Sequence, residues 1–370
     1  MNVLYFGGFD LPDKNAAAQR VIANAKILRD IGWAVTLVGL DKKPGAFSFD
    51  GFDCINLKYP SSPIEWWRYL ATIKDYRALL QEREPQLVIA YNHPAVALEK
   101  MLVYCKTKGI KVLSDCTEWY TPEGNVIQRT VKSWDTKKRM TDVQMRIDGV
   151  ISISRYLHEY YSSRGQKSIL VPPLVDAKSA KWQGTVKKGC EAISLAYAGS
   201  PGHKDRLDVL VRIVSELSEK ISLRFEIIGL DRDQFIRLYN YEQTIPAEIC
   251  FHGRLPHEET LHILRGVDFQ IFIREDNLTT RAGFPTKFVE SITSCVPVLT
   301  NLTSNIGDYL SIGKNGFPVD ASTEEALRQS LEQVLSMPRE TLKGVRDAID
   351  SETFDYRRYK EQFKEFIDKL

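Results

Sequence analysis

The residues best suited to chemistry lie at 278–300, in LTTRAGFPTKFVESITSCVPVLT. Pro285 disfavours a helix interior and Thr286 is a favoured N-cap type, so a helix is predicted to begin near Lys287 with Thr286 as its cap. The free N–H groups and positive dipole end of such a helix suit a phosphate or carboxylate. Lys287 adds a positive charge, and Glu290, one turn further on, can accept hydrogen bonds from a sugar. The pattern predicts an anion and sugar site; the alternative is an ordinary surface loop before a helix.

Short apolar strands alternate with helices along the whole chain, which predicts parallel sheets in an α/β fold. The predicted strands are 2–6, 33–40, 54–57, 86–91, 110–114, 148–154, 168–171, 193–198, 223–228, 249–252, 268–273 and 296–299. The predicted helices are 16–31, 63–81, 94–106, one ending at 163, 206–218, 257–265, one starting near 287, 324–335 and 356–370. The last has an apolar face and must therefore dock on another part of the protein.

Two domains are predicted from the length and from a linker. The chain has 370 residues, which exceeds the usual size of about 100–200 residues per domain. Pro172 and Pro173 end a predicted strand, and the lysine-rich stretch 176–189 has no hydrophobic periodicity. Because the alternation of strands and helices restarts after this stretch, we expect a Rossmann-like half on either side of it.

The composition excludes several classes of protein. Fifty basic and 48 acidic residues give a net charge of +2, which argues against a nucleic-acid-binding protein. No apolar run approaches the ~18 residues of a membrane-spanning helix, and a strand follows Met1 directly, so neither a span nor a signal peptide is expected. The six cysteines form no CxxC pair, as in a reduced cytosolic protein without disulfides. The six histidines have no ligand spacing, so no metal is expected.

A glycine pair follows the first predicted strand. Gly7 and Gly8 lie where a nucleotide-binding loop would begin, but the dinucleotide fingerprint GxGxxG is absent. The loop that follows is also longer than a dinucleotide site uses. We therefore expect Gly7 and Gly8 to let another molecule approach the backbone in a cleft.

Three segments carry a resemblance to a known family. They are AYAGSPGHKDRLDVLV at 196–211, FHGRLPHEETLHIL at 251–264 and RAGFPTKFVESITSCVPVLTNLTSNIGDYL at 281–310. In order and spacing they resemble the nucleotide-sugar-binding domain of retaining GT-B glycosyltransferases, the family four (glycosyl transferases group 1) type. Gly7, Gly8 and Arg20 fit the N-terminal domain of the same family, so the resemblance covers nearly the whole chain.

The resemblance implies a fold and domain bounds. The expected fold is α/β, with two Rossmann-like domains in the GT-B architecture and a cleft between them. An acceptor-side domain would span 1–175, and a nucleotide-sugar-binding domain would span 176–354. The C-terminal helix, at 355–370, would cross back onto the N-terminal domain.

The resemblance also implies a donor site. Lys204 matches the diphosphate-binding lysine of the family, and its charge suits a pyrophosphate leaving group; the alternative is an exposed lysine at a helix start. Glu290 matches the second glutamate of the E-x7-E motif, which binds the ribose. Ala282 replaces the first glutamate, so its contact with the donor sugar is missing at that position. The full donor-binding set is Gly7, Gly8, Gly199, Ser200, Lys204, Gly253, Arg254, Arg281, Gly283, Phe284, Pro285, Thr286, Lys287 and Glu290.

Some members of this set have distinct expected roles. Arg281 and Lys287 flank the missing glutamate and could serve the diphosphate, with salt-bridged surface charges as the alternative. Gly283 and Phe284 would offer backbone N–H groups. The stretch at 253–254 lies in the region that packs the nucleobase.

The catalytic candidates are Glu118, Asp115 and Lys204. The two carboxylates follow a predicted strand, where the family often has a histidine and this chain has Thr117. Either carboxylate could contact the donor sugar or accept a proton from the acceptor, and bracing the loop is the alternative. We expect Glu118 to replace the missing glutamate. His93 could line the same cleft, although a lone loop histidine is more often structural.

These features predict a metal-independent enzyme that moves a sugar from a UDP- or GDP-sugar to a hydroxyl of a glycan or lipid-linked acceptor. Retention of configuration and a role in bacterial surface polysaccharide or glycoconjugate synthesis are expected. One alternative is a nucleotide-sugar epimerase of the same fold. Another, motivated by Ala282 and Thr117, is a non-catalytic nucleotide-sugar-binding partner protein.

Aromatic and basic residues adjoin in two segments of the N-terminal half. Trp66 and Trp67 precede three basic residues at positions 68, 74 and 77, and Trp134 lies within a basic run at 132–139. Such a surface can lie on an anionic membrane, where each Lys or Arg contributes about 1 kcal/mol. Core packing of the tryptophans is the equal alternative. A cytoplasmic protein with peripheral contact at the inner face of the membrane is expected.

Overall fold

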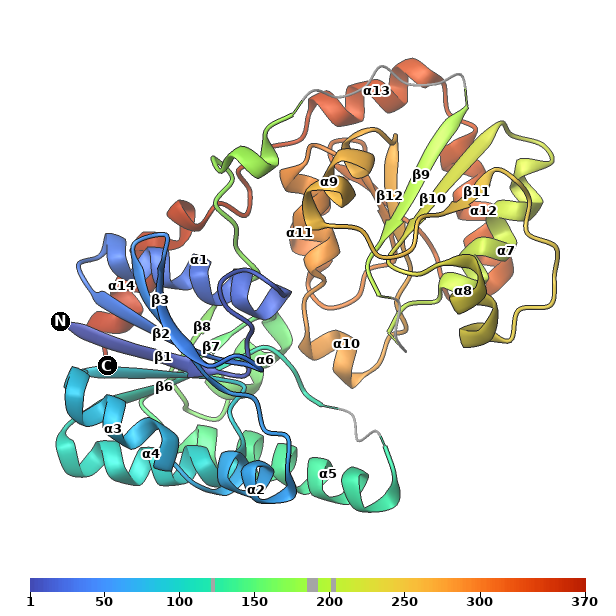
Figure 1. The fold of residues 1–370 in the computed structure, drawn as a ribbon. Helices are drawn as coiled ribbons and strands as arrows, with labels where there is room; N and C mark the ends of the chain where they lie inside the picture. The colour runs from blue at the N-terminus through green and yellow to red at the C-terminus, as the bar shows by residue number, and fades with distance from the viewer. Residues whose placement is uncertain (121–123, 185–191, 201–203) are drawn as a thin grey trace. The chain divides into compact units, whose positions relative to one another are not determined.

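The computed structural model describes residues 1–120, 124–184, 192–200 and 204–370. The chain forms two compact units (Figure 1). The first comprises Met1–Asp176 with Arg281–Phe284 and Asp355–Leu370, and the second comprises Ala177–Thr280 with Pro285–Phe354. In the described part of the chain, no helix is both long enough and apolar enough to cross a membrane.

An eight-stranded sheet forms the centre of the first unit, in the order β3-β4-β2-β1-β5-β6-β7-β8. Its strands are β1 (Asn2–Gly7), β2 (Ala34–Asp41), β3 (Gly45–Phe49), β4 (Phe52–Lys58), β5 (Leu87–Tyr91), β6 (Lys111–Cys116), β7 (Gly149–Ser152) and β8 (Ser168–Leu170). All neighbours are parallel except the edge strand β3, which is antiparallel to β4. The helices are α1 (Ala16–Asp30), α2 (Pro63–Ala71), α3 (Lys74–Arg83), α4 (Ala95–Lys108), α5 (Val126–Thr141) and α6 (Arg155–Ser162), with the 3-10 turn η1 (Val143–Met145).

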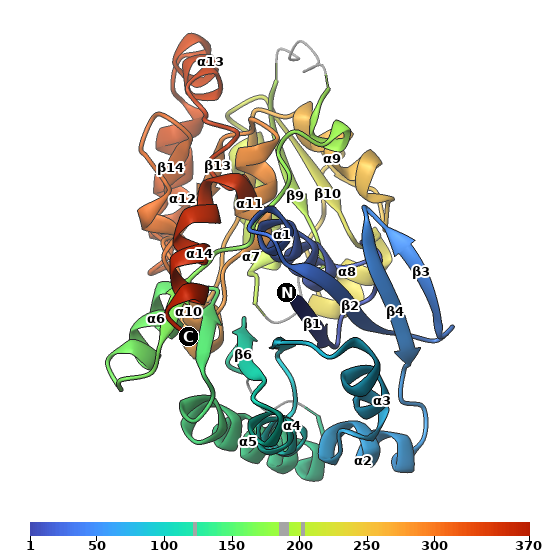
Figure 2. The same cartoon turned by 90° about the vertical axis from the view of Figure 1, so that its left-hand side faces the viewer.

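Helices cover both faces of this sheet, which explains why its central strands are apolar on both sides. Every residue of β1 from Val3 to Gly7 is buried. Figures 1 and 2 show α1 and α14 (Lys360–Asp368) over one face and α3, α4 and α5 over the other. Tyr5, in register with Leu37 and Ile89, lies in the core that includes α1 and α14.

A six-stranded parallel sheet forms the centre of the second unit, in the order β11-β10-β9-β12-β13-β14. Its strands are β9 (Ile193–Ala198), β10 (Leu223–Ile228), β11 (Ile249–Phe251), β12 (Phe269–Phe272), β13 (Val298–Thr300) and β14 (Gly316–Pro318). The helices in this part of the chain are α7 (Leu207–Ser218), α8 (Arg232–Tyr239), α9 (His257–Arg265), α10 (Leu278–Ala282), α11 (Thr286–Thr293), α12 (Glu324–Leu335) and α13 (Arg339–Asp347), with the turns η2 (Ala180–Trp182) and η3 (Ile306–Asp308).

The final helix packs on the first unit. Phe363 and Ile367 of α14 are buried in the same core as α1 and β1, and the preceding turn η4 (Tyr356–Tyr359) adds Tyr356. A backbone bridge between Val175 and Asp355 holds the start of this segment. The predicted α/β fold with two parallel-stranded, Rossmann-like sheets and a returning C-terminal helix is confirmed.

The structure differs from the predicted elements in a few places. The single helix predicted at 63–81 is divided into α2 and α3, because Thr72 takes an extended backbone (φ −138°, ψ 165°) and ends α2. In the predicted linker 176–189, the turn η2 buries Trp182, and residues 185–189 lie outside the described part. The elements β3, β14, α5, α8, α10 and α13 have no counterpart among the predicted elements.

Candidate active site

A charged cluster lies at the N-terminal end of α11 in the second unit. Lys287, the second residue of this helix, places its Nζ 2.8 Å from Oδ2 of Asp205, and its side chain is 17% exposed. The Tyr197 hydroxyl donates a 2.6 Å hydrogen bond to the same oxygen, and Nε of Arg274 lies 3.9 Å from Oδ1. Asp205 therefore fixes Lys287 in place while part of the lysine remains accessible to a ligand.

The strand order brings these residues together. Tyr197 lies on β9, and the neighbouring strand β12 ends just before Arg274. An antiparallel bridge joins Asp205 to Arg274, and the N–H of Glu275 donates to the carbonyl of Lys204 at 3.3 Å. Burial, and then the Asp205 carboxylate, raise the pKa of Tyr197, so its hydroxyl stays protonated and continues to donate.

Three glycines, Gly199, Gly229 and Gly253, lie at the strand ends beside this cluster, and the first two are closely approached by neighbouring atoms. A Cβ on Gly199 would lie 2.9 Å from Cε of Lys287, and a Cβ on Gly229 would lie 2.3 Å from the carbonyl oxygen of Gly199. The N–H of Gly229 also donates to the carbonyl of Gly253 at 2.8 Å. The loops after β9, β10 and β11 thus pack against one another, and the predicted residues Gly199 and Gly253 come together here.

The other predicted residues of the second unit lie on the same loops. Ser200 and Arg254 are exposed, and Lys204 is half-buried. Residues 201–203 of the predicted loop lie outside the described part of the chain. These positions put polar and basic groups at the carboxyl edge of the sheet, where parallel α/β proteins bind ligands.

The predicted cap of α11 is wrong. Pro285 occupies the N-cap position, Thr286 is the first helical residue, and no cap side chain binds the end of the helix. Proline at this position has no hydroxyl or carboxylate with which to satisfy the first N–H groups. The positive end of α11 beside Lys287 is therefore not covered by its own cap.

Glu290 faces a histidine that is not among the predicted site residues. Its Oε1 lies 3.6 Å from Nε2 of His257, the first residue of α9, and the Glu290 side chain is 20% exposed. The His257 ring packs edge-on against Trp182 at 6.0 Å between centroids. His257 is the first residue of HEETLHIL at 257–264, which is part of a segment that carries the family resemblance, and this placement is the sequence signal that could have identified it. His257 therefore lies beside the carboxylate that is predicted to bind ribose, without a hydrogen bond between the two side chains.

The stretch Arg281–Phe284 belongs with the first unit. Ala282, at the position of the missing glutamate, is fully buried, and its carbonyl accepts a 2.7 Å hydrogen bond from the Ser154 hydroxyl. Phe284 is also buried, whereas Arg281 is exposed and Gly283 is half-buried. From Pro285 onward the chain returns to the second unit, so the predicted donor residues are divided between the two units.

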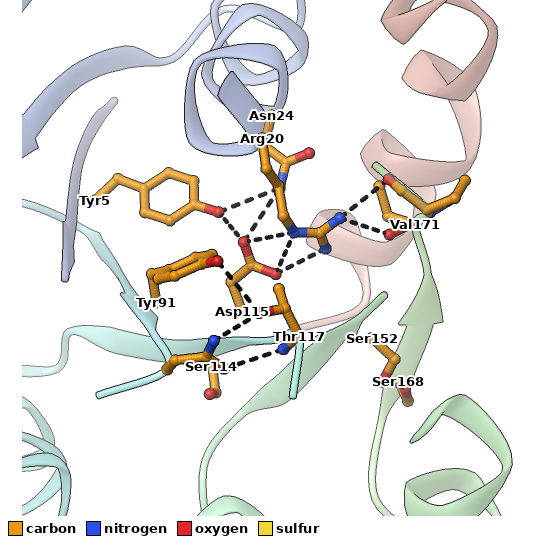
Figure 3. Close-up of polar contacts among 12 residues, drawn as sticks. Tyr5, Arg20, Asn24, Tyr91, Ser114, Asp115, Thr117, Ser152, Ser168 and Val171 are labelled. Atoms are coloured by element: carbon orange, nitrogen blue, oxygen red, sulfur yellow. Dashed lines mark hydrogen bonds and ion pairs between the residues drawn. The ribbon is translucent and has the colours of Figure 1, made fainter. Parts of the chain in front are cut away.

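Asp115 lies at the centre of a buried network in the first unit (Figure 3). Its side chain has no exposed surface, and it accepts hydrogen bonds from Nη2 and Nε of Arg20 at 2.7 to 3.1 Å. The Tyr5 hydroxyl donates to the same carboxylate, and Arg20 also donates to the carbonyl of Val171 at 2.8 Å. The network ties α1 to the ends of β6 and β8. A catalytic role for Asp115 is contradicted, because its carboxylate is sealed from any substrate; bracing is its role.

The electrostatics of this network agree with a permanent ion pair. Burial lowers the pKa of Arg20, but the Asp115 carboxylate outweighs it, so the net change is upward. Burial and then Asp115 raise the pKa of Tyr5 well above its ordinary value, so the phenol remains a hydrogen-bond donor.

Glu118 lies on a loop that is anchored on both sides. The N–H of Thr117 donates to Oδ1 of Asn92 at 3.0 Å, and the amide of Asn92 donates to Oγ1 of Thr117 at 2.6 Å. The carbonyl of Glu118 accepts from Nη2 of Arg139 at 3.1 Å. Glu118 itself is half-buried. Its backbone is fixed while its carboxylate keeps access to solvent, so it remains the acid–base candidate of the first unit.

His93 is a core residue. It is fully buried among Phe6, Tyr69 and Tyr76, with ring centroids 4.8, 5.4 and 5.5 Å away, and neither ring nitrogen has a hydrogen-bond partner. Burial, reinforced by the charge of Arg139, lowers the pKa of His93 to about 3. The structural role that the sequence favoured for His93 is confirmed, and the alternative that it lines a cleft is wrong.

Gly7 and Gly8 differ in what requires them. A Cβ on Gly7 would lie 2.6 Å from the carbonyl oxygen of Tyr91, so the close approach of β1 and β5 excludes any side chain. Gly8 is exposed, and a Cβ there would lie 3.3 Å from the Tyr69 hydroxyl. The packing of the sheet therefore explains the glycine at position 7. Gly8 instead leaves the backbone at the end of β1 accessible to solvent. Within the described ranges, no three His, Cys, Asp or Glu side chains lie close enough to hold a metal ion.

The second unit matches a known family. Residues 184–349 fit the family model described as glycosyl transferases group 1. No curated protein sequence matches the chain.

Solved structures resemble the whole chain. Sucrose-phosphate synthase from Thermosynechococcus elongatus has a TM-score of 0.71 at 13% identity, covering 100% of this chain and 99% of that one. HepE from Anabaena, in complex with UDP-glucose, has a TM-score of 0.71 at 13% identity over 100% of both chains. The lipopolysaccharide outer core galactosyltransferase WaaB, in its apo form, has a TM-score of 0.63 at 15% identity over 100% of both chains. The shared fold confirms the predicted GT-B architecture.

The bracing role of Asp115 predicts a loss of stability on substitution. Asp115→Asn leaves the buried Arg20 cation unpaired and should lower the free energy of unfolding by about 3–5 kcal/mol. Asp115→Leu combined with Arg20→Met removes both charges and should recover most of that loss. Urea denaturation followed by tryptophan fluorescence measures both. A fully stable Asp115→Asn protein would contradict the bracing role.

The buried His93 predicts a stability that falls with acid. In the unfolded chain, His93 binds a proton below its ordinary pKa of 6.5. In the folded chain, burial lowers the pKa of His93 to about 3. Between these values the free energy of unfolding should fall by up to ~1.4 kcal/mol per pH unit from this residue. His93→Phe should therefore flatten the pH dependence in this window. Urea unfolding at several pH values tests the slope, and parallel curves for the two proteins would refute the assignment.

Proposed function

We propose that this chain, a nucleotide-sugar-dependent glycosyltransferase of the group 1 family, transfers a sugar from a UDP- or GDP-sugar to a hydroxyl group with retention of configuration. The acceptor we propose is a glycan or a lipid-linked saccharide, in the synthesis of bacterial surface polysaccharides or glycoconjugates on the cytoplasmic side. The family match over 184–349 supports the reaction class. The fold shared with HepE, whose structure contains UDP-glucose, supports the class of donor.

The observation that carries the proposal is the position of Lys287. Its ammonium group is fixed by Asp205 at 2.8 Å, next to Gly199, and at the end of a helix that no cap side chain covers. A fixed cation at the positive end of a helix is complementary to a diphosphate. We place the diphosphate of the donor at this end of α11, with Lys204 as its second cation.

These cations would act on the leaving group. Negative charge grows on the diphosphate as the glycosidic bond breaks, so a cation placed there stabilises the transition state more than the bound donor. Glu290, whose Oε1 lies 3.6 Å from Nε2 of His257, would accept hydrogen bonds from the ribose hydroxyls. Arg281, Gly283 and Phe284 complete the donor site in this proposal, the last two through backbone N–H groups.

Glu118 would supply the carboxylate that the motif lacks at Ala282. Asp115 is sealed by Arg20 and Ala282 has no carboxylate, so Glu118, which is half-buried, is the remaining carboxylate among the predicted catalytic residues. We propose that its carboxylate either accepts the proton of the acceptor hydroxyl or stabilises the positive charge that develops on the donor sugar. The anchoring of its backbone by Arg139 would keep it in position during the reaction.

The diphosphate assignment predicts a selective loss of affinity. Lys204→Ala should weaken binding of nucleoside diphosphate about tenfold, through loss of a charge-assisted contact, while binding of nucleoside monophosphate changes much less. Thermal shift and isothermal titration with UDP, UMP, GDP and GMP measure this difference. Lys220→Ala is the control, because Lys220 is an exposed lysine of the same unit (66% exposed). Equal losses for diphosphate and monophosphate would remove Lys204 from the site.

Substitutions of Glu118 and Glu290 should have different effects on kcat and on the KM for the donor. Glu118→Gln should lower kcat by about 10²–10⁴ with little change in donor KM, since its carboxylate acts mainly in the transition state. Glu290→Gln should instead raise donor KM through a lost ribose contact and lower kcat less. Glu82→Gln, on the exposed surface of α3 (64% exposed), is the control. A normal kcat for Glu118→Gln would reject this assignment.

A further inference from the structure

Helices α2, α4 and α5 form one layer on the first unit (Figure 2). α4 packs against both α2 and α5. Nζ of Lys100 on α4 donates to the carbonyl of Ala71 at the end of α2 at 2.7 Å, and Nζ of Lys138 on α5 lies 3.0 Å from Glu99 on α4. These contacts make the three helices a single surface, which we call the α2–α4–α5 face.

This face exposes large apolar side chains. Trp67 on α2 is 63% exposed and Trp134 on α5 is 54% exposed. Ile64 and Val131, also exposed, lie three residues before these tryptophans, so each pair lies on one side of its helix. No residue of α2 is buried, so its apolar side chains do not serve the core. The alternative that these tryptophans pack in a core is wrong.

Basic side chains surround the exposed aromatic residues. α5 carries five basic residues and one acidic residue, and Arg129, Lys132 and Lys137 among them are exposed. The acidic residue, Asp135, accepts a 2.8 Å hydrogen bond from the N–H of Ala95 at the start of α4. Helices α2, α4 and α5 together carry nine basic and three acidic residues, whereas the whole chain has a net charge of only +2, so this face is more positive than the rest of the protein.

A groove of about 840 Å³ opens on the same layer, where α3 meets α4. Ile73 and Val103 contribute apolar surface to it, and Lys74, Arg77 and Lys100 contribute positive charge. Apolar and cationic groups in one groove match a phospholipid, which has an acyl chain and a phosphate.

We propose that the α2–α4–α5 face binds an anionic lipid surface and that the acceptor is lipid-linked. The lipid-linked acceptor rests on the proposed function. Lysine is depleted from the cores of protein–protein interfaces, so its presence beside exposed tryptophans argues against a protein partner. Tryptophan and basic residues are both favoured at a membrane surface. Each Lys or Arg near an anionic surface raises the affinity about fivefold.

The inner side of α5 connects this face to the candidate active site. Arg139 is 1% exposed, and its Nη2 donates to the carbonyl of Glu118 at 3.1 Å. Its guanidinium lies over the ring of Tyr120 at 5.1 Å. The helix that presents Trp134 to the membrane thus also positions the loop of the proposed base. A lipid-linked acceptor would be held at the surface next to that loop.

Vesicle binding tests the proposal independently of activity. The full-length protein should sediment with vesicles of phosphatidylcholine and phosphatidylglycerol, should not sediment with phosphatidylcholine alone, and should be released by high salt. Lys132→Glu combined with Lys137→Glu, and separately Trp67→Ser combined with Trp134→Ser, should each weaken binding at least about tenfold. Lys364→Glu combined with Lys369→Glu is the matched control, because these exposed lysines lie at the C-terminal helix on the opposite face of the sheet.

The possible outcomes distinguish a failure of the lipid-binding inference from a failure of the proposed function. Binding that ignores the lipid charge, or an equal loss in the α14 control, would overturn the proposal. So would a dimer in lipid-free sedimentation that the tryptophan substitutions dissociate, because the face would then be occupied by a second copy. Normal UDP binding by all three double variants shows that they are folded. Transfer to a water-soluble saccharide without any vesicle binding would retain the proposed function and reject this inference.

Discussion

A buried carboxylate held by a cation and a tyrosine fixes the carboxyl edge of the sheet in each unit. In the first unit the trio is Asp115, Arg20 and Tyr5; in the second it is Asp205, Lys287 and Tyr197. In both units the tyrosine lies on the first strand. The exposure of the cation separates the two trios, because Arg20 is 3% exposed and Lys287 is 17% exposed. The same chemical arrangement is closed in one unit, where it supports the fold, and open in the other, where its cation can meet a ligand.

Local signals in the sequence were sufficient for most of the fold. The strand β9 and the helices α9 and α12 match their predicted ranges residue for residue, because apolar periodicity and flanking glycines or prolines mark their ends. The division between α2 and α3 was missed, since an extended residue such as Thr72 leaves no interruption in a helical apolar pattern. The elements without a predicted counterpart are mostly short, and short elements carry too few residues to establish a period.

The site could be predicted by position but not by side-chain environment. Asp115 and Glu118 both follow the predicted strand 110–114, and both were catalytic candidates, with Glu118 preferred as the replacement for the missing glutamate. What distinguishes them is Arg20, 95 positions away, whose side chain reaches Asp115 and leaves Glu118 with access to solvent. A contact across that separation leaves no local trace in the sequence. The same limit applies to His93 and Trp134, for which a loop position and an amphipathic pattern were compatible with either burial or exposure.

The return of α14 to the first unit has a consequence for biosynthesis. Phe363 and Ile367 complete the core around α1 and β1, yet they are translated after the whole of the second unit. Domains generally fold as units in the order in which they leave the ribosome. Here the sheet synthesised first must wait, with part of its apolar core uncovered, until the last helix emerges, while the later sheet already has its full set of strands and helices. The first unit is therefore the part of a nascent chain most dependent on chaperone protection, and truncation near the C-terminus should harm the unit that lies furthest from it in sequence.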